Sequence, residues 1–313
     1  MKPIKQTLVS GAMMLALSLV FTSCEDILGE WSRPAPNPVT PTPEPEPTPA
    51  GTYRVYTSGT AYTDEPIPAG AIAVETSAAV TWSAGTYVVS SDVSISGEIT
   101  LDGNVNLILC DGAELTVKGR IVGGDKSLNI YGQTAGTGKL TMNGVGSHNI
   151  YVKYLQIHGG DITGTNSEHA LFTNGTLKIY HGNISATAVN FGLVANGNLS
   201  IYGGTITASS TAADAVFVND ASMEMTGGSL TATATASGTA GVKVDHDIDI
   251  FGGTIIATGG PSGEGFIGTL TNKTGASLNI GSKANVGDAW TVEPVANDAA
   301  ATQFARYMIL PKP

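Results

Sequence analysis

Three aspartates in the C-terminal third of the chain form its most concentrated group of potential metal ligands. Asp245, Asp247 and Asp249 are close together, and the last two alternate with Ile248 and Ile250. In a strand, side chains two residues apart share a face, so Asp247 and Asp249 would point outward together. Carboxylate oxygens are ligands of Ca²⁺. The group predicts either a weak site for Ca²⁺, the only cofactor that the sequence suggests, or, as the favoured interpretation, a solvated acidic strand edge.

The sequence offers little else for catalysis. A polysaccharide lyase needs a carboxylate cluster for calcium and a Lys or Arg that removes a proton beside a uronate. A glycoside hydrolase needs two or three carboxylates on one face. Arg120 is the only arginine between residues 55 and 305. We predict no catalytic residue, and a lyase or hydrolase that uses the three aspartates is the alternative hypothesis.

A mostly aromatic column recurs at one place in a repeated sequence word. Its members are Tyr131, His158, Tyr180, Tyr202, Thr226 and Phe251. Polar residues stand two positions earlier, among them Gln156 and Lys178. Sugars pack their C–H groups on aromatic rings while their hydroxyls take hydrogen bonds. The pattern therefore predicts a glycan-binding stripe on an outer face, made of Tyr131, His158, Tyr180, Tyr202, Phe251, Lys178 and Gln156.

The same column has a second interpretation. Rings on neighbouring strands can stack and stabilise a sheet by about 0.2–1 kcal/mol per pair. Thr226 interrupts the column, so a binding site would centre on Tyr180 and Tyr202. The predicted partner is a polysaccharide or the glycan of a glycoprotein. A structural or protein-binding role remains a third possibility.

The word itself repeats along the chain, with residues 199–204 (LSIYGG) as its clearest copy. Its first residue, the anchor, recurs at spacings of 22 to 30 residues, which indicates a solenoid. The anchors are Val105, Leu128, Leu155, Leu177, Leu199, Met223, Ile248 and Leu278.

Each repeat contains three short strands. Apolar residues at the anchor and two positions later have the period of a strand, and a Gly-Gly pair ends it. A second strand centres on Ile162, Ile184, Ile206, Leu230 and Ile255. A third apolar position holds Leu171, Leu193, Val216, Val242 and Ile267. The sequence predicts an all-β, single-domain right-handed parallel β-helix of about eight coils over residues 101–286.

Two smaller features are predicted to be structural. Asn174, Asn196, Asn219 and Asp245 precede successive anchors, where such side chains bond their own turns, so they should form a ladder. Cys110 is expected to be a buried thiol rather than a nucleophile.

The first 23 residues have the pattern of a secretory signal. Lys2 and Lys5 precede an apolar run from Ala12 to Phe21, and residues 20–24 (VFTSC) look like a bacterial lipoprotein cleavage box. Cys24 would then carry the lipid (palmitate-type) anchor. An ordinary secretory peptide is the alternative. Glu25 and Asp26 resemble a surface-export signal, so the expected location is the outer membrane, lipid-anchored and facing outward.

The rest of the chain divides around the repeats. Residues 24–50 form a proline-rich linker, with eight prolines between positions 34 and 49. Residues 51–100 are expected to form the N-terminal cap and first strands, and 287–313 the C-terminal cap, as a short helix or a covering strand. The formal net charge of −11 argues against nucleic acid as a partner.

At residues 105–117 and 128–142, and at the words IYGGTITA and IFGGTIIATGG, the chain resembles a family of right-handed β-helical surface lipoproteins of Bacteroides-like gut bacteria. Members are often described as carbohydrate-binding, and the architecture is shared with pectate-lyase-like enzymes. The resemblance covers about residues 93–260. It implies the β-helix and is compatible with glycan binding or adhesion.

Overall fold

The computed structural model describes residues 51–144, 146–166, 168–302 and 304–311. These residues contain strands, turns and irregular segments and no helix, which confirms the all-β prediction. The signal segment, Cys24 and the proline-rich linker lie outside the described residues. The described residues belong to one compact unit.

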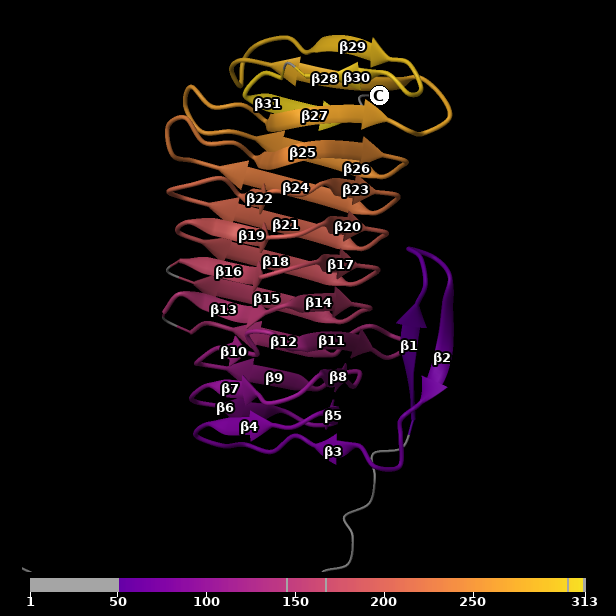
Figure 1. The fold of residues 1–313 in the computed structure, drawn as a ribbon, viewed down its shortest axis with the longest axis vertical. Helices are drawn as coiled ribbons and strands as arrows, with labels where there is room; N and C mark the ends of the chain where they lie inside the picture. Colours follow the sequence, from indigo (N-terminus) through magenta and orange to yellow (C-terminus); the bar gives the residue numbers. More distant parts are fainter. Residues whose placement is uncertain (1–50, 145, 167, 303, 312–313) are drawn as a thin grey trace, which may run out of the picture. The chain divides into compact units, whose positions relative to one another are not determined.

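Strands stack in three parallel columns, so each coil contributes one strand to each column (Figure 1). The first column holds the anchor strands, and their anchors pair in register from coil to coil. Its members are β3 (Ile72–Ala73), β5 (Gly85–Val89), β8 (Val105–Leu109), β11 (Ser127–Gly132), β14 (Tyr154–Ile157), β17 (Leu177–Ile179), β20 (Leu199–Ile201), β23 (Met223–Met225) and the ends of β25 (Val242–Ile250) and β27 (Phe266–Asn272).

The other two columns complete the coil. The second comprises β6 (Val93–Ile95), β9 (Glu114–Val117), β12 (Lys139–Met142), β15 (Asp161–Asn166), β18 (Asn183–Ala188), β21 (Thr205–Ser210), β24 (Ser229–Ala234) and β26 (Thr254–Thr258). The third comprises β4 (Val80–Trp82), β7 (Ile99–Leu101), β10 (Ile121–Val122), β13 (His148–Val152), β16 (His169–Thr173), β19 (Phe191–Ala195), β22 (Val216–Val218) and the starts of β25 and β27. The parallel β-helix has about nine coils, close to the predicted eight.

The core is a stack of aliphatic side chains inside the three columns. Leu177 and Ile179 of β17 are fully buried and pair in register with Leu199 and Ile201 of the next coil. Burial of one such side chain contributes about 1.5–3 kcal/mol. The alternation read from the sequence therefore marks the inward face correctly.

The Gly-Gly corner has a backbone cause. The second glycine adopts a positive φ, as at Gly182 (111°) and Gly204 (85°), which residues with a side chain rarely adopt. The first position is less restricted, and His181 occupies it in one coil.

The predicted ladder before the anchors is also present. The Asn196 amide donates to the Asn174 side-chain oxygen, and the Asn219 amide donates to that of Asn196, each across 3.3 Å. Asp245 ends the series by accepting the backbone N–H of Asp220 at 3.1 Å.

The last repeat differs from the prediction. Leu270, not Leu278, pairs with Ile248 as the final anchor, and Phe266, not Ile267, takes the third apolar position. Leu278 instead begins β28, which pairs antiparallel with β29 and β31 rather than in parallel with a strand of the preceding coil. The repeat therefore ends near Asn272.

A small antiparallel sheet covers the C-terminal end of the β-helix. Its members are β28 (Leu278–Lys283), β29 (Thr291–Val295) and β31 (Tyr307–Leu310), while β30 (Ala300–Ala301) pairs with β27. β31 also pairs with β26, so the cap covers the open strand edge. The covering-strand form of the prediction is the one observed.

The N-terminal segment departs from the cap prediction. β1 (Thr52–Tyr56) and β2 (Tyr62–Pro66) form an antiparallel hairpin that runs along the side of the coils, across their strands (Figure 1). The coils themselves begin at β3 to β5. Residues 51–66 thus cover a side face rather than the end.

Candidate functional site

The aromatic column forms one stacked ladder on the outer side of the first column of strands. Ring centroids lie 4.7 Å apart for Tyr131 and His158, 4.5 Å for His158 and Tyr180, and 4.8 Å for Tyr180 and Tyr202. The planes are within 8–14° of parallel. The inner rings therefore cover one another's faces and present only their edges. This geometry matches the stabilising interpretation, because a sugar packs on a ring face.

The hairpin closes over the lower part of this ladder. The Tyr53 ring meets Tyr131 edge to face at 4.9 Å, and the Tyr56 ring stacks on His181 at 4.6 Å. The backbone N–H of Tyr56 donates to His158 Nδ1 at 3.1 Å. His158 is 4% exposed, which corrects the prediction that it lies open on an outer face.

Burial changes the titration of the covered rings. It lowers the pKa of His158 to about 4 and raises the pKa of Tyr131 to about 12. The neutral imidazole carries its hydrogen on Nε2, because Nδ1 accepts the Tyr56 bond. Both groups are uncharged at neutral pH and serve as packing surface.

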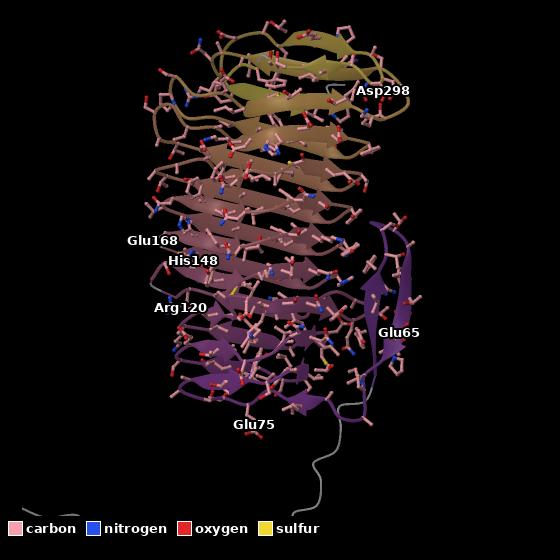
Figure 2. All side chains as sticks on the ribbon, viewed as in Figure 1. Glu65, Glu75, Arg120, His148, Glu168 and Asp298 are labelled. Carbon is pink, nitrogen blue, oxygen red and sulfur yellow. The ribbon has the colours of Figure 1, made fainter. Side chains whose placement is uncertain are left out.

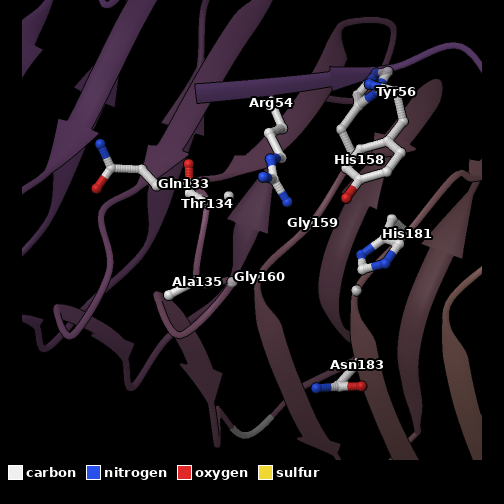
Figure 3. A pocket seen from close by; sticks show the side chains of 13 residues that line it. Arg54, Tyr56, Gln133, Thr134, Ala135, His158, Gly159, Gly160, His181 and Asn183 are labelled. Carbon is white, nitrogen blue, oxygen red and sulfur yellow. The ribbon is translucent and has the colours of Figure 1, made fainter. Parts of the chain in front are cut away.

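A small pocket remains between the hairpin and the Gly-Gly corners (Figure 3). It has a volume of about 130 Å³ and is lined in part by Arg54, Tyr56, His158 and His181. Arg54 extends from β1 over the corner, and its Nε lies 3.3 Å from Asp64 Oδ1.

Beneath the base of the hairpin is a second, outer hydrophobic cluster. Ile67 packs there on Val88 and Ile108, which point away from the core. Cys110 contacts this cluster and the core and is half-buried rather than fully buried, with a thiol pKa raised first by burial and then by Asp111.

The aspartates do not converge. Asp245 and Asp247 are exposed on β25, Asp249 stands beside Glu224 of the preceding coil, and His246 pairs with Asp220 at 3.3 Å. Within the described residues, no three His, Cys, Asp or Glu side chains are grouped to hold a metal ion. This arrangement matches the solvated acidic edge.

A second aromatic surface was not predicted. It lies on the outer side of the third column, which is the edge of the coils opposite the hairpin, as His148 and Glu65 show in Figure 2. Its members are His148, Tyr151, His169, Phe172, Phe191 and Phe217. Lys243 covers the upper end, with Nζ 4.8 Å from the Phe217 centroid. Tyr151, Phe172 and Phe217 each directly follow a third apolar position, a signal that was readable in the sequence.

Two predicted ligand residues lie side by side elsewhere on the first column. Gln156 and Lys178 pair in register on β14 and β17, and with Tyr154 and Thr176 they line a shallow hollow of about 240 Å³, which we call the Tyr154 hollow. Tyr154 is 41% exposed and is absent from the stacked ladder. The repeat pattern did not reveal it, because it stands one position before the anchor. A wider hollow of about 490 Å³ lies between the hairpin turn and Tyr202.

No protein-family model, curated protein or solved structure matches this chain. In the described part of the chain, no helix has the length and apolarity needed to cross a membrane. The kind of ligand that the hollows could bind is therefore inferred from their geometry.

The Tyr154 hollow differs from the wider one in having an exposed aromatic ring beside its free polar groups. In the wider hollow, Ser58 Oγ accepts the N–H of Ala61, and Tyr202 is stacked on Tyr180. In the Tyr154 hollow, no hydrogen bond between described residues engages the side chains of Gln156, Thr176 or Lys178. These groups are available to a ligand.

Proposed function

We propose that this protein is a lipid-anchored surface protein that binds glycans through the Tyr154 hollow. The observation that carries the proposal is an exposed aromatic ring bordered by unused polar side chains. Tyr154 supplies the apolar face, the Gln156 amide and the Thr176 hydroxyl both donate and accept, and Lys178 donates. A pyranose needs this combination.

The position of the hollow favours binding over a purely structural role. It lies on the flat outer side of parallel strands, where the backbone is held by the in-register pairs of β14 and β17. Binding there does not require the backbone to become ordered, which reduces the entropy lost on binding. The ladder supplies rigidity nearby through Tyr180, whose ring is stacked on both sides.

The N-terminal sequence supports the anchored location. The box ending at Cys24 would place a lipid there, and an extended proline-rich linker at about 3 Å per residue would separate the binding domain from the membrane by roughly 50 Å. Metabolic labelling with a radioactive fatty acid tests this part. Label that disappears in Cys24→Ala is the expected result, and unchanged label contradicts it.

A glycan array probed with the full-length chain tests the binding. We expect Tyr154→Ala to abolish the binding found for the wild type. Phe251→Ala is the matched control, because Phe251 is similarly exposed, at 46%, but lies outside the hollow. No signal on neutral or acidic glycans, or equal loss in both variants, would overturn the proposal.

A further inference from the structure

Two ammonium groups stand beside the exposed ring of the Tyr154 hollow. Lys178 lines the hollow, and Lys153, which is outside its lining, places Nζ over one face of the Tyr154 ring, 5.2 Å from the centroid. Among the described residues, neither lysine is within ion-pair distance of a carboxylate. Both charges can therefore act on a ligand that packs against this ring.

The surroundings leave this positive charge largely uncompensated. The residues that line the hollow include no carboxylate. Lys153 interacts electrostatically with Asp125, whose pKa is lowered mainly by its hydrogen bond from Lys126 and more weakly by Lys153. Asp125 is paired with Lys126 at 2.8 Å. The chain as a whole has a formal net charge of −11, so the hollow is a small positively charged region on an acidic protein.

We propose that the sugar recognised in the Tyr154 hollow carries a carboxylate. This inference rests on the proposed glycan binding and names the class of ligand. The sugar ring packs on Tyr154, its carboxylate is held by Lys153 and Lys178, and its hydroxyls bond to Gln156 and Thr176. Charge-assisted hydrogen bonds are about twice as strong as neutral ones, so the acidic group dominates the selectivity.

The net charge limits how acidic the ligand can be. A polyanion would be repelled by the acidic molecule over a distance of about 10 Å at 0.1 M salt. A single carboxylate meets only the two nearby lysines. The structure therefore favours an otherwise neutral glycan that bears isolated uronate or sialic-acid units over a densely charged polysaccharide.

Calorimetric titration of the full-length chain with matched oligosaccharides tests this inference. The pairs are sialyllactose against lactose and cellobiouronic acid against cellobiose, which separate the two sources of the carboxylate. We expect one acidic member to bind about tenfold more tightly than its neutral partner, and this preference to shrink at high salt. In the double variant Lys153→Gln, Lys178→Gln, the preference should disappear.

The controls distinguish the possible failures. Lys139→Gln removes an exposed lysine of β12 and should leave the preference unchanged. Equal binding of both members of each pair overturns the inference and leaves glycan binding intact, as does an array that is positive only for neutral glycans. No binding to either pair together with an empty array overturns both. A preference that survives in the double variant overturns the assignment of the lysines.

Discussion

The backbone N–H of Tyr56 and Nδ1 of His158 form a buried hydrogen bond, 3.1 Å long, between segments 102 residues apart. The bond attaches the β1–β2 hairpin, which is not part of the repeat, to the aromatic ladder, which the repeats form. The bond requires an unprotonated Nδ1, so the attachment depends on the charge of one imidazole.

Acidification should therefore weaken this contact. Burial lowers the pKa of His158 to about 4 from an ordinary value of 6.5. Because the unfolded chain binds the proton first, the stability from neutral His158 is complete above pH 6.5 and is lost as the pH falls toward 4. Between pH 7.5 and 5, denaturant titration should show a loss of about 2 kcal/mol from this group.

Two variants separate His158 from the other histidines. His158→Asn keeps an acceptor oxygen near the position of Nδ1 but does not titrate. The loss of unfolding free energy between pH 7.5 and 5 should therefore be about 2 kcal/mol smaller in this variant. His246→Asn is the matched substitution at a histidine whose side chain is 54% exposed and lies against Asp220 rather than the hairpin. Identical slopes for the wild type and His158→Asn would contradict the assignment.

The turn of the hairpin should be intolerant of a side chain. A Cβ on Gly59 would collide with the Tyr202 carbonyl, so Gly59→Ala should lift the turn. The collision should destabilise the closed position of the hairpin by about 1–3 kcal/mol. Hydrogen exchange of the Tyr56 amide should then accelerate on the order of ten- to hundredfold. Gly70→Ala is the control, since a Cβ there meets nothing within 4 Å. Unchanged exchange in Gly59→Ala would count against the packing described.

Neighbouring isoleucines on β26 test the alternation of the strands. Ile255 is fully buried, and Ile256 is 40% exposed. Ile255→Ala should reduce the free energy of unfolding by about 2–5 kcal/mol, and Ile256→Ala by less than about 1 kcal/mol. Thermal and denaturant unfolding measure both, and similar losses would mean that the register of β26 is wrong.

The asparagine ladder should contribute measurable stability. Asn196 bonds both Asn174 and Asn219, so Asn196→Ala removes two hydrogen bonds and should cost about 1–3 kcal/mol. Asn279→Ala, at an exposed position of β28, should change the free energy of unfolding by less than about 0.5 kcal/mol. Equal effects would show that the ladder bonds are replaced by water without loss.

The candidate site was predictable in part. Gln156 and Lys178 were found because they occupy the same position in successive repeats. In a parallel β-helix, equivalent positions of successive repeats lie next to each other. Tyr154 was missed because its place holds Ser127 and Thr176 in adjacent coils, so no aromatic column marks it.

The sequence by itself determined the coils. Its apolar alternation and the glycine after each anchor strand are local properties, and repetition alone places Leu177 beneath Leu199. Tertiary structure alone decided which outer faces stay open. The hairpin has no copy elsewhere in the chain, and its place on the ladder depends on long-range contacts such as the Tyr56–His158 hydrogen bond, the ring contacts of Tyr53 and Tyr56, and the close approach of Gly59 to Tyr202. The orientation of the ladder rings is likewise set by stacking between coils, which residue spacing does not specify.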